Sequence, residues 1–294
     1  MKLPALLLSV SLLFLGFFAH SQEEDSGQAK AKKLADGLNY QKGEITLRDG
    51  LARIHVPSGF RYINAADSNT VLSKIWGNPP NSNTLGMLVP SDLSVASQEG
   101  WGVIITYDED GYVKDDDAAK IDYTKLLKQM QDSTREGNAE REKEGYAPIE
   151  LVGWATPPRY NKATHKMYWA KELKFGNSPE STLNYNIRIL GRKGVLVLNA
   201  VAGMGQLREI EQAAPQILAM VDFQQGNRYV DFNKSTDKVA TYGIAALVAG
   251  GVLAKVGAFK ALIPILLGAK KLVIVAVVAV AAFFKRIFGK NQTQ

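Results

Sequence analysis

Two long apolar stretches near the C-terminus constrain what this chain can fold into more than any other feature. They cover residues 239–259 and 261–284 and contain few polar residues. A transmembrane helix needs about 20 apolar residues, whereas a soluble helix of this length usually carries a polar face. In the first stretch, Lys255 lies close enough to the end to reach the membrane interface. The sequence therefore predicts a membrane anchor over residues 237–288, followed by a polar tail over residues 289–294.

The second apolar stretch leaves the number of membrane crossings open. Lys270 and Lys271 lie near its middle, where they would cost on the order of 5 to 7 kcal/mol at the centre of a bilayer. A segment that begins at Leu272 either crosses with its flanking basic residues at the interfaces or lies in the interface as an amphipathic helix. Because positive residues in short loops prefer the cytoplasmic side, we favour an odd number of crossings over a two-helix hairpin.

The N-terminus has the three-part form of a secretory signal. Lys2 precedes an apolar run over residues 6–18, and Ala19 and Ser21 provide the small residues that a signal peptidase reads. We expect residues 1–21 to be a cleaved signal peptide, with an uncleaved N-terminal helix as the alternative. The main domain is then exported and held at the membrane, on the periplasmic side of the inner membrane if the cell is Gram-negative. Because the chain has no cysteine, a packed core and not a disulfide must stabilise this domain.

The charge is unevenly distributed along the chain. Residues 238–294 hold seven Lys and one Arg but no acid, and the signal holds one Lys. Of the net charge of +6, residues 22–237 therefore carry −3. A nucleic-acid-binding protein would concentrate its basic residues on the folded domain, and nucleic acid is excluded as a partner on this ground. The expected partners are the lipid bilayer and an unidentified envelope protein.

Residues 44–236 have the pattern of an α+β domain, with an antiparallel sheet packed against two or three helices. Residues 22–43 before them are polar and are expected to form a linker or a loose helix. The expected strands lie at 44–47, 51–56, 60–63, 85–90, 101–107, 148–156, 165–175 and 183–202, and the last of these turns at 191–194 to make two strands. The expected helices lie at 65–76, 118–130 and 206–220.

Alternation of apolar and polar residues is clearest in the strand that begins at Leu183. Side chains two positions apart in a strand share a face of the sheet. The side chains expected to face inward are Leu183, Tyr185, Ile187 and Ile189, and those expected to face outward are Asn184, Asn186 and Arg188.

Four segments closely resemble the signature segments of a bacterial family of unknown function whose members are described as membrane-anchored. They are DGYVKDDDAAKIDYTKLLKQMQ, GYAPIELVGWATPPRYNKATHKMYWAKEL, LNYNIRILGRKGVLVLNAVA and GNRYVDFNKSTDKVATYGIAALVAGG. The resemblance covers most of residues 40–288 and implies an exported domain held by its C-terminus, without an established activity or catalytic residues. In addition, IHVPSGF and a strand pair followed by a final helix resemble the Mog1/PsbP-type α+β sandwich, which concerns the fold alone.

Few residues suit catalysis or metal binding. Without the signal, the chain keeps two histidines, His55 and His165, and it has no HExxH, GxSxG, Walker A or dinucleotide-binding motif. We therefore expect no metal and no cofactor. For a hydrolase of unrecognised type, the best candidate acids and base are Asp108, Asp110 and His165.

The acidic run DEDGYVKDDD begins at Asp108 and raises the question of a calcium site. An EF-hand loop does not fit, because with Gly111 in the sixth position Thr106 would be first and no Glu would be twelfth. We favour a solvated turn at Asp110 and Gly111, followed by acidic residues at the N-terminus of a helix.

Aromatic residues are concentrated in the segment GWATPPRYNKATHKMYWAKEL. Trp154, Tyr160, Tyr168 and Trp169 are candidates for lining a binding groove. Core packing of alternate strand residues is the competing interpretation for at least half of them. With the anchor and the missing catalytic motifs, the sequence favours a binding or scaffolding module of the cell envelope. An envelope hydrolase is the alternative.

Overall fold

A seven-stranded antiparallel sheet forms the centre of the fold in this computed structural model, which describes residues 21–78, 83–97, 99–143 and 145–250. Its strands are β3 (Phe60–Asn64), β4 (Thr84–Pro90), β5 (Gly102–Asp108), β7 (Ile149–Asn161), β8 (Lys166–Phe175), β9 (Thr182–Leu190) and β10 (Val195–Gly203). They follow the order β3-β4-β5-β10-β9-β8-β7, so β3 and β7 are the edges.

Two smaller sheets and five α-helices complete the described chain. The sheets are formed by β1 (Glu44–Leu47), β2 (Ala52–His55) and β11 (Val221–Phe223), and by β6 (Tyr112–Lys114) and β12 (Val239–Gly243). The helices are α1 (Ser21–Asp36), α2 (Ala65–Thr70), α3 (Tyr123–Lys143), α4 (Leu207–Met220) and α5 (Ile244–Val248). The chain divides into two compact units, residues 1–245 and 246–294, and the three sheets of the described residues lie in the first. The predicted α+β class with an antiparallel sheet is confirmed.

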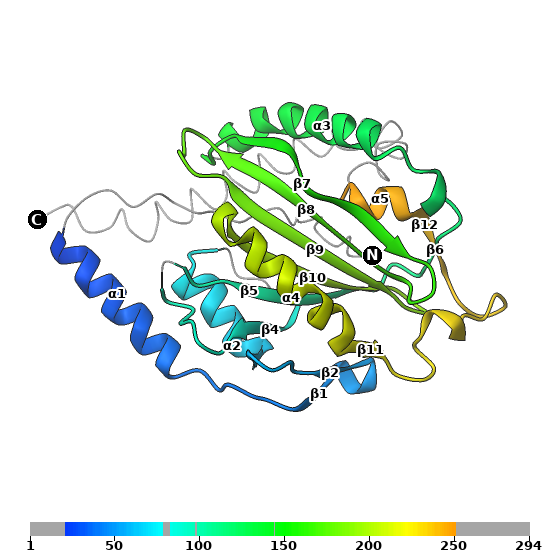
Figure 1. Cartoon of the computed structure of the whole chain (residues 1–294), viewed down its shortest axis with the longest axis horizontal. Helices are drawn as coiled ribbons and strands as arrows, with labels where there is room; N and C mark the ends of the chain where they lie inside the picture. Colours follow the sequence, from blue (N-terminus) through cyan, green and yellow to red (C-terminus); the bar gives the residue numbers. More distant parts are fainter. Residues whose placement is uncertain (1–20, 79–82, 98, 144, 251–294) are drawn as a thin grey trace, which may run out of the picture. The chain divides into compact units, whose positions relative to one another are not determined.

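Helix α4 covers one face of the large sheet (Figure 1). The side chains of β9 that the sequence predicts to face inward are buried on this face with Ile210, Ala214 and Ile217 of α4. Lys166 holds the end of this helix, because its ammonium group donates hydrogen bonds to the carbonyl oxygens of Leu218 (2.7 Å) and Val221 (2.8 Å). The predicted helix at 206–220 and the inward face of β9 are both confirmed.

The first helices of the chain cover one end of the opposite face. Met87 and Val89 of β4 are buried there with Val71, Leu72, Ala35 and Leu38 in one apolar cluster. Of the two alternatives expected for residues 22–43, the structure shows the helix, since most of the segment is α1, and the residues at its end belong to the core. The buried side chains are those of Ala35, in the last turn of α1, and Leu38, just beyond the end of the helix.

Helix α3 lies alongside the edge strand β7 (Figure 1). The side-chain amide of Asn138 donates to the Ile149 carbonyl oxygen (2.9 Å) and its oxygen accepts from the Ile149 N–H (2.8 Å). Gln131 donates to the carbonyl oxygens of Leu151 (3.2 Å) and Val152 (3.1 Å). These amides take the hydrogen-bonding positions that a neighbouring strand would otherwise occupy.

Two of the three β9 side chains predicted to face outward are also buried, and the third, Asn184, is partly buried. Asn186 is 3% exposed and Arg188 is 9% exposed, so the prediction that they point into solvent is wrong. The cause lies in the neighbouring strand, because β10 is apolar at nearly every position from Val195 to Ala202. Such an uninterrupted apolar run is typical of a strand that is covered on both faces.

The acidic residues before α3 serve two different helices. The helix starts at Tyr123 and not at Ala118, and Asp122 accepts hydrogen bonds from the backbone N–H groups of Thr124 (3.1 Å) and Lys125 (3.0 Å). The prediction that the Asp115–Asp117 run lies at the start of this helix is therefore wrong. Asp117 instead accepts from the N–H of Ile244 at the start of α5, at 3.0 Å.

The folded unit continues past the boundary predicted at residue 236. Residues 239–243 form β12, which runs parallel to β6, so the membrane crossing predicted from Val239 differs from the structure at its start. Gly111, at φ 107°, makes this possible, because a Cβ there would lie 2.7 Å from the Lys238 carbonyl oxygen. The Tyr242 hydroxyl also donates to Asp110 (2.6 Å), which ties the strand to the loop after β5.

Within the described residues, no helix has both the length and the apolar character that a membrane crossing requires. The predicted anchor beyond Gly250, the polar tail over 289–294 and residues 1–20 of the predicted signal peptide lie outside the described residues.

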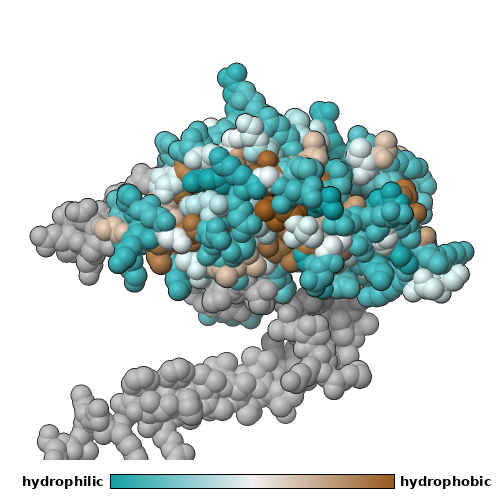
Figure 2. All heavy atoms as spheres, turned by 90° about the horizontal axis from the view of Figure 1, so that it is seen from below, coloured by the Kyte–Doolittle hydropathy of each residue, from teal (hydrophilic) through white to brown (hydrophobic). Residues whose placement is uncertain are grey.

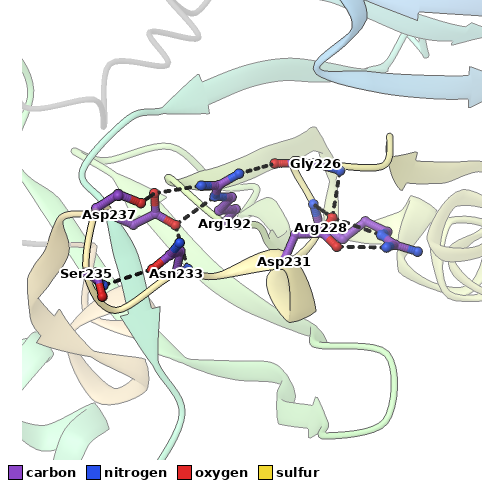
Figure 3. A network of polar contacts seen from close by, with 8 residues as sticks. Arg192, Gly226, Arg228, Asp231, Asn233, Ser235 and Asp237 are labelled. Carbon is purple, nitrogen blue, oxygen red and sulfur yellow. Dashed lines mark hydrogen bonds and ion pairs between the residues drawn. The ribbon is translucent and has the colours of Figure 1, made fainter.

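An ion pair fixes the segment that leads into β12 (Figure 3). Arg192, in the turn between β9 and β10, binds both carboxylate oxygens of Asp237, at 2.6 and 2.9 Å. It also donates to the Gly226 carbonyl oxygen (3.2 Å). The predicted turn at 191–194 is confirmed, and its arginine joins the large sheet to the last part of the described chain.

Candidate functional site

The strand register places a group of polar side chains on the face of the large sheet opposite α4. Asn186 of β9 pairs with Trp169 of β8 on one side and with Asn199 of β10 on the other. Two positions along, Lys171 pairs with Asn184. Because alternate residues share a face, Arg188 lies on this face too. We name this set the sheet-face patch, which consists of Trp169, Lys171, Asn184, Asn186, Arg188 and Asn199.

The Asp108 carboxylate acts on the charge of Arg188 from beyond ion-pair distance, but the hydrogen bonds of the guanidinium go to neutral groups. The guanidinium donates from Nη1 to the Ile187 carbonyl oxygen (2.9 Å) and to Asn199 Oδ1 (3.1 Å), and from Nη2 to Asn186 Oδ1 (3.4 Å). The group also lies 5.0 Å from the centre of the Trp169 ring, which is a cation–π distance. Burial lowers the pKa of Arg188 to about 10, so the side chain is still charged at neutral pH.

Lys171 brings a second positive charge to the patch. No hydrogen bond or ion pair joins its ammonium group to any described residue, and the side chain is partly buried. Burial, together with the charge of Arg188, lowers the pKa of Lys171 from its usual 10.5 to about 8. At neutral pH the patch therefore holds two neighbouring cations.

One donor in the patch has no acceptor. Trp169 is 1% exposed, and its indole Nε1–H makes no hydrogen bond. A buried indole N–H usually finds a partner, and leaving a buried donor unsatisfied costs about 1 to 3 kcal/mol. The patch thus combines two positive charges with an unused neutral donor.

The candidate base His165 lies in a different place, in the turn between β7 and β8. Its Nδ1 is 3.1 Å from the Tyr160 hydroxyl, and that hydroxyl donates to Asp115 (2.8 Å). The His165 ring stacks on Tyr229, with 4.1 Å between the ring centres. Desolvation by burial lowers the pKa of His165, and this effect is opposed by Asp115. The backbone of His165 is in the left-handed region, at φ 54°.

The two candidate acids do not join this histidine in any contact between described residues. Asp108 is exposed at the end of β5, and Asp110 accepts the hydrogen bond from Tyr242. The carboxylate nearest to His165 is that of Asp115, at 3.8 Å, a residue that the sequence assigns to a helix N-terminus. Within the described chain, no cluster of three or more His, Cys, Asp or Glu side chains could hold a metal ion.

The four aromatic candidates point in different directions. Tyr168 packs against the core under α4, beside Tyr185, whereas Trp169 belongs to the sheet-face patch. Trp154 donates to the Tyr123 carbonyl oxygen at the start of α3 (3.2 Å), and Tyr160 lies beside His165. They do not line one groove. The face drawn in Figure 2 is mostly hydrophilic, with apolar residues in small areas between polar ones.

A hollow of about 390 Å³ lies near the turn that holds Arg192. The residues that line this hollow carry both positive and negative charges. Arg192 is paired with Asp237 and Glu109 with Arg48, so the charged lining residues without an ion pair to a described residue are the lysines Lys193 and Lys238. The residues around it are Glu109, Gly111, Arg192, Lys193, Thr236, Asp237 and Lys238.

Sequence reasoning includes Trp169 among its candidates but misses Lys171 and Arg188. The signal that could have found them is the apolar run of β10, which indicates burial on both faces and hence a buried position for Arg188 in the next strand. The lack of an ion pair at either cation cannot be read from the sequence, because it depends on side chains brought together by the fold.

Comparison with known proteins gives a family and distant structural likenesses. A family model described as "Protein of unknown function (DUF2167)" matches residues 39–281. No curated protein matches the sequence.

Three solved structures are similar to the chain at low identity. The PsbP protein (CyanoP) of the cyanobacterium Synechocystis has 7% identity and a TM-score of 0.35, covering 64% of this chain and 94% of its own. The Ran-binding protein Mog1p of Saccharomyces cerevisiae has 13% identity and a TM-score of 0.35, covering 63% and 96%. LpqN of Mycobacterium tuberculosis, involved in cell envelope biogenesis, has 15% identity and a TM-score of 0.31, covering 66% and 96%. Likenesses this distant carry no argument, and the Mog1/PsbP assignment stays a prediction.

Proposed function

The chain belongs to the DUF2167 family, whose function is unknown, and from its site we propose that it is a binding module that holds an anionic group at the sheet-face patch. The observation that carries this proposal is the pair of cations, Lys171 and Arg188, with no described carboxylate within ion-pair distance of either. A charge removed from water is costly unless an opposite charge or hydrogen bonds compensate it. A bound anion would supply that compensation.

Two other shielded cations of the same domain are paired, whereas Arg61 is held by the carbonyl oxygens of Pro90 and Leu93. The Lys166 side chain is 13% exposed and lies 2.9 Å from the Asp222 carboxylate. Arg192 is 24% exposed and lies 2.6 Å from Asp237. Lys171 and Arg188 differ from Lys166 and Arg192 in that neither forms an ion pair with a described residue. Residues 251–294 contain no Asp or Glu, so no acidic side chain of that segment can provide the missing charge.

The site of His165 supports a binding module better than a hydrolase. Its ring is covered on one face by Tyr229, and its Nδ1 is engaged by Tyr160. The predicted acids, Asp108 and Asp110, make no contact with it among the described residues. These contacts join the β7–β8 turn to the neighbouring segments, which is a structural role.

The proposal is tested by anion-dependent stabilisation of the full chain in detergent. We expect acetate or phosphate, at constant ionic strength, to raise the thermal unfolding temperature, since a ligand that binds only the folded state stabilises it. The Lys171→Met variant should lose this shift. Lys174→Met is the matched control, because Lys174 lies on the same strand with similar exposure but on the opposite face, and it should keep the shift. Equal shifts in both variants would contradict the proposal.

We also propose that the domain is exported and anchored to the membrane by its C-terminal segment, with the bilayer and an envelope protein as partners. The supporting features are the signal-like N-terminus, the apolar stretches and the basic residues around them. A reporter enzyme that works only in the cytoplasm, fused after Gln294, should be active if the number of crossings is odd. Activity only from a periplasm-dependent reporter would instead establish the two-helix hairpin. Copurification with envelope proteins from detergent-solubilised membranes would identify the partner.

A further inference from the structure

We propose that the group bound at the sheet-face patch is a phosphate monoester dianion, from either a free phosphorylated compound or a lipid headgroup. This inference rests on the proposed function and adds the chemical class of the ligand. It depends on the number and kind of hydrogen-bonding atoms that the patch leaves unused.

Arg188 keeps one edge of its guanidinium available. The group has five N–H donors, and both Nη1 hydrogens are used by the Ile187 carbonyl oxygen and Asn199 Oδ1. One Nη2 hydrogen is directed to Asn186 Oδ1. Among the described residues, nothing accepts from Nε–H or from the second Nη2 hydrogen. These two donors form the fork that binds two oxygens of a phosphate or a carboxylate at once.

The remaining free groups of the patch are also donors. Lys171 offers an ammonium group with three hydrogens, and Trp169 offers its unpartnered indole N–H. With the Arg188 fork, about six donor hydrogens are available to a ligand. A carboxylate has two oxygens to meet them, whereas a phosphate monoester has three strong acceptor oxygens and a charge of about −1.5 to −2 at pH 7. The second ligand offers more acceptor oxygens to these donors and more negative charge to the two cations than a carboxylate does.

The amide oxygens of the patch already have donors. Asn184 Oδ1 accepts from Asn186 Nδ2 at 2.9 Å, and the oxygens of Asn186 and Asn199 accept from Arg188. A ligand that must itself donate hydrogen bonds, such as a protonated acid or a sugar hydroxyl, finds few acceptors here. The patch therefore favours an acceptor-only, fully ionised group.

The test uses the full chain in detergent and isothermal titration calorimetry with methyl phosphate, inorganic phosphate and acetate. At pH 7 we expect both phosphates to bind at least tenfold more tightly than acetate. Affinity for methyl phosphate should rise as the dianion forms near pH 6 and fall above pH 8, where Lys171 loses its proton. Trp169→Phe, which keeps a ring but removes the N–H, and Arg188→Lys, which keeps the charge but removes the fork, should each weaken phosphate binding about tenfold. Lys174→Met should leave it unchanged.

Vesicles distinguish the two sources of the phosphate. The reconstituted chain should also be titrated with methyl phosphate in phosphatidylcholine vesicles and in vesicles that contain phosphatidic acid. If the ligand is a lipid headgroup, vesicles with phosphatidic acid should abolish the binding of methyl phosphate. Vesicles that carry the same charge as phosphatidylserine should leave it intact. Unchanged binding in both sets indicates a soluble ligand.

The outcomes separate this inference from the proposed function. If acetate binds as tightly as methyl phosphate and both depend on Lys171, the phosphate assignment is overturned while the anion-binding module stands. If no anion binds, or binding is the same in Lys171→Met, both are overturned. Circular dichroism verifies the fold of each variant. If Arg188→Lys does not fold, Trp169→Phe still tests the inference, because it changes the side-chain volume only slightly.

Discussion

The carboxylate of Asp117 accepts a hydrogen bond from the backbone N–H of Ile244, at 3.0 Å, across 127 positions of the chain. Its other oxygen accepts from Ala245 at the same distance. A single side chain from the loop before α3 thus fixes the end of β12 to the rest of the domain. The fit is close, because a Cβ on Gly243 would lie 2.8 Å from the Asp117 carboxylate.

Replacing Asp117 with Ala should lower the free energy of unfolding by about 1 kcal/mol, the usual cost of losing a side chain that caps a helix. Urea unfolding of the variant measures this loss. Asp116→Ala is the control, since Asp116 is exposed and no described residue forms an ion pair or hydrogen bond with it. Equal stabilities for the two variants would show that the contact to Ile244 contributes nothing.

The two faces of β9 should respond differently to truncation, although both are buried. Ile187 is 2% exposed in the core under α4, and Ile187→Ala should cost about 2 to 5 kcal/mol. Asn186→Ala should cost about 1 to 3 kcal/mol, because it leaves Arg188 Nη2 without its acceptor. Chemical denaturation measures both. A cost near zero for Asn186→Ala would indicate that the face opposite α4 is solvated.

Lys171 should make stability depend on pH in alkaline solution. Its pKa is about 8 in the folded chain and 10.5 when unperturbed, so between these values the unfolded chain binds more protons and stability rises with pH. Lys171→Met lacks this contribution. Without added anions, the variant should therefore be more stable than the parent below pH 8, and its advantage should shrink from pH 8 to 9.5. Thermal unfolding at matched ionic strength tests this, and an advantage that grows with pH would have the wrong sign.

Asn138 should protect the edge strand β7. Asn138→Ala removes both hydrogen bonds to Ile149 and should destabilise the domain by about 1 to 3 kcal/mol. It should also promote self-association, because exposed strand edges pair with other chains. Sedimentation velocity over a range of concentrations tests the second effect. Gln129→Ala, at an exposed position of the same helix, should remain like the parent.

Local patterns predict most of the secondary structure but not what covers it. The apolar alternation of β9 and the spacing in α4 identify both elements and the core face between them. The same alternation makes Asn186 and Arg188 look solvent-exposed, because a polar residue in a strand normally points to water. Their burial follows from long-range packing, which is also why the unpaired cations of the patch are not visible in the sequence.

The end of the domain could not be predicted for a similar reason. Hydropathy groups Val239 with the apolar residues that follow, whereas the pairing of β12 with β6 depends on the close approach at Gly111. The sequence also identifies His165 as a candidate base. The carboxylate nearest to it, that of Asp115, comes from a separate segment of the chain. Contacts of this kind require the three-dimensional arrangement.

The turn at position 165 imposes two independent demands on one residue. A left-handed backbone excludes most side chains, and Asn, Asp and His are the non-glycine types that tolerate it best. The stack with Tyr229 requires a flat aromatic ring, which Asn, Asp and Gly lack. Histidine alone satisfies both demands, so its presence here is accounted for by conformation and shape, and no catalytic role is needed to explain it.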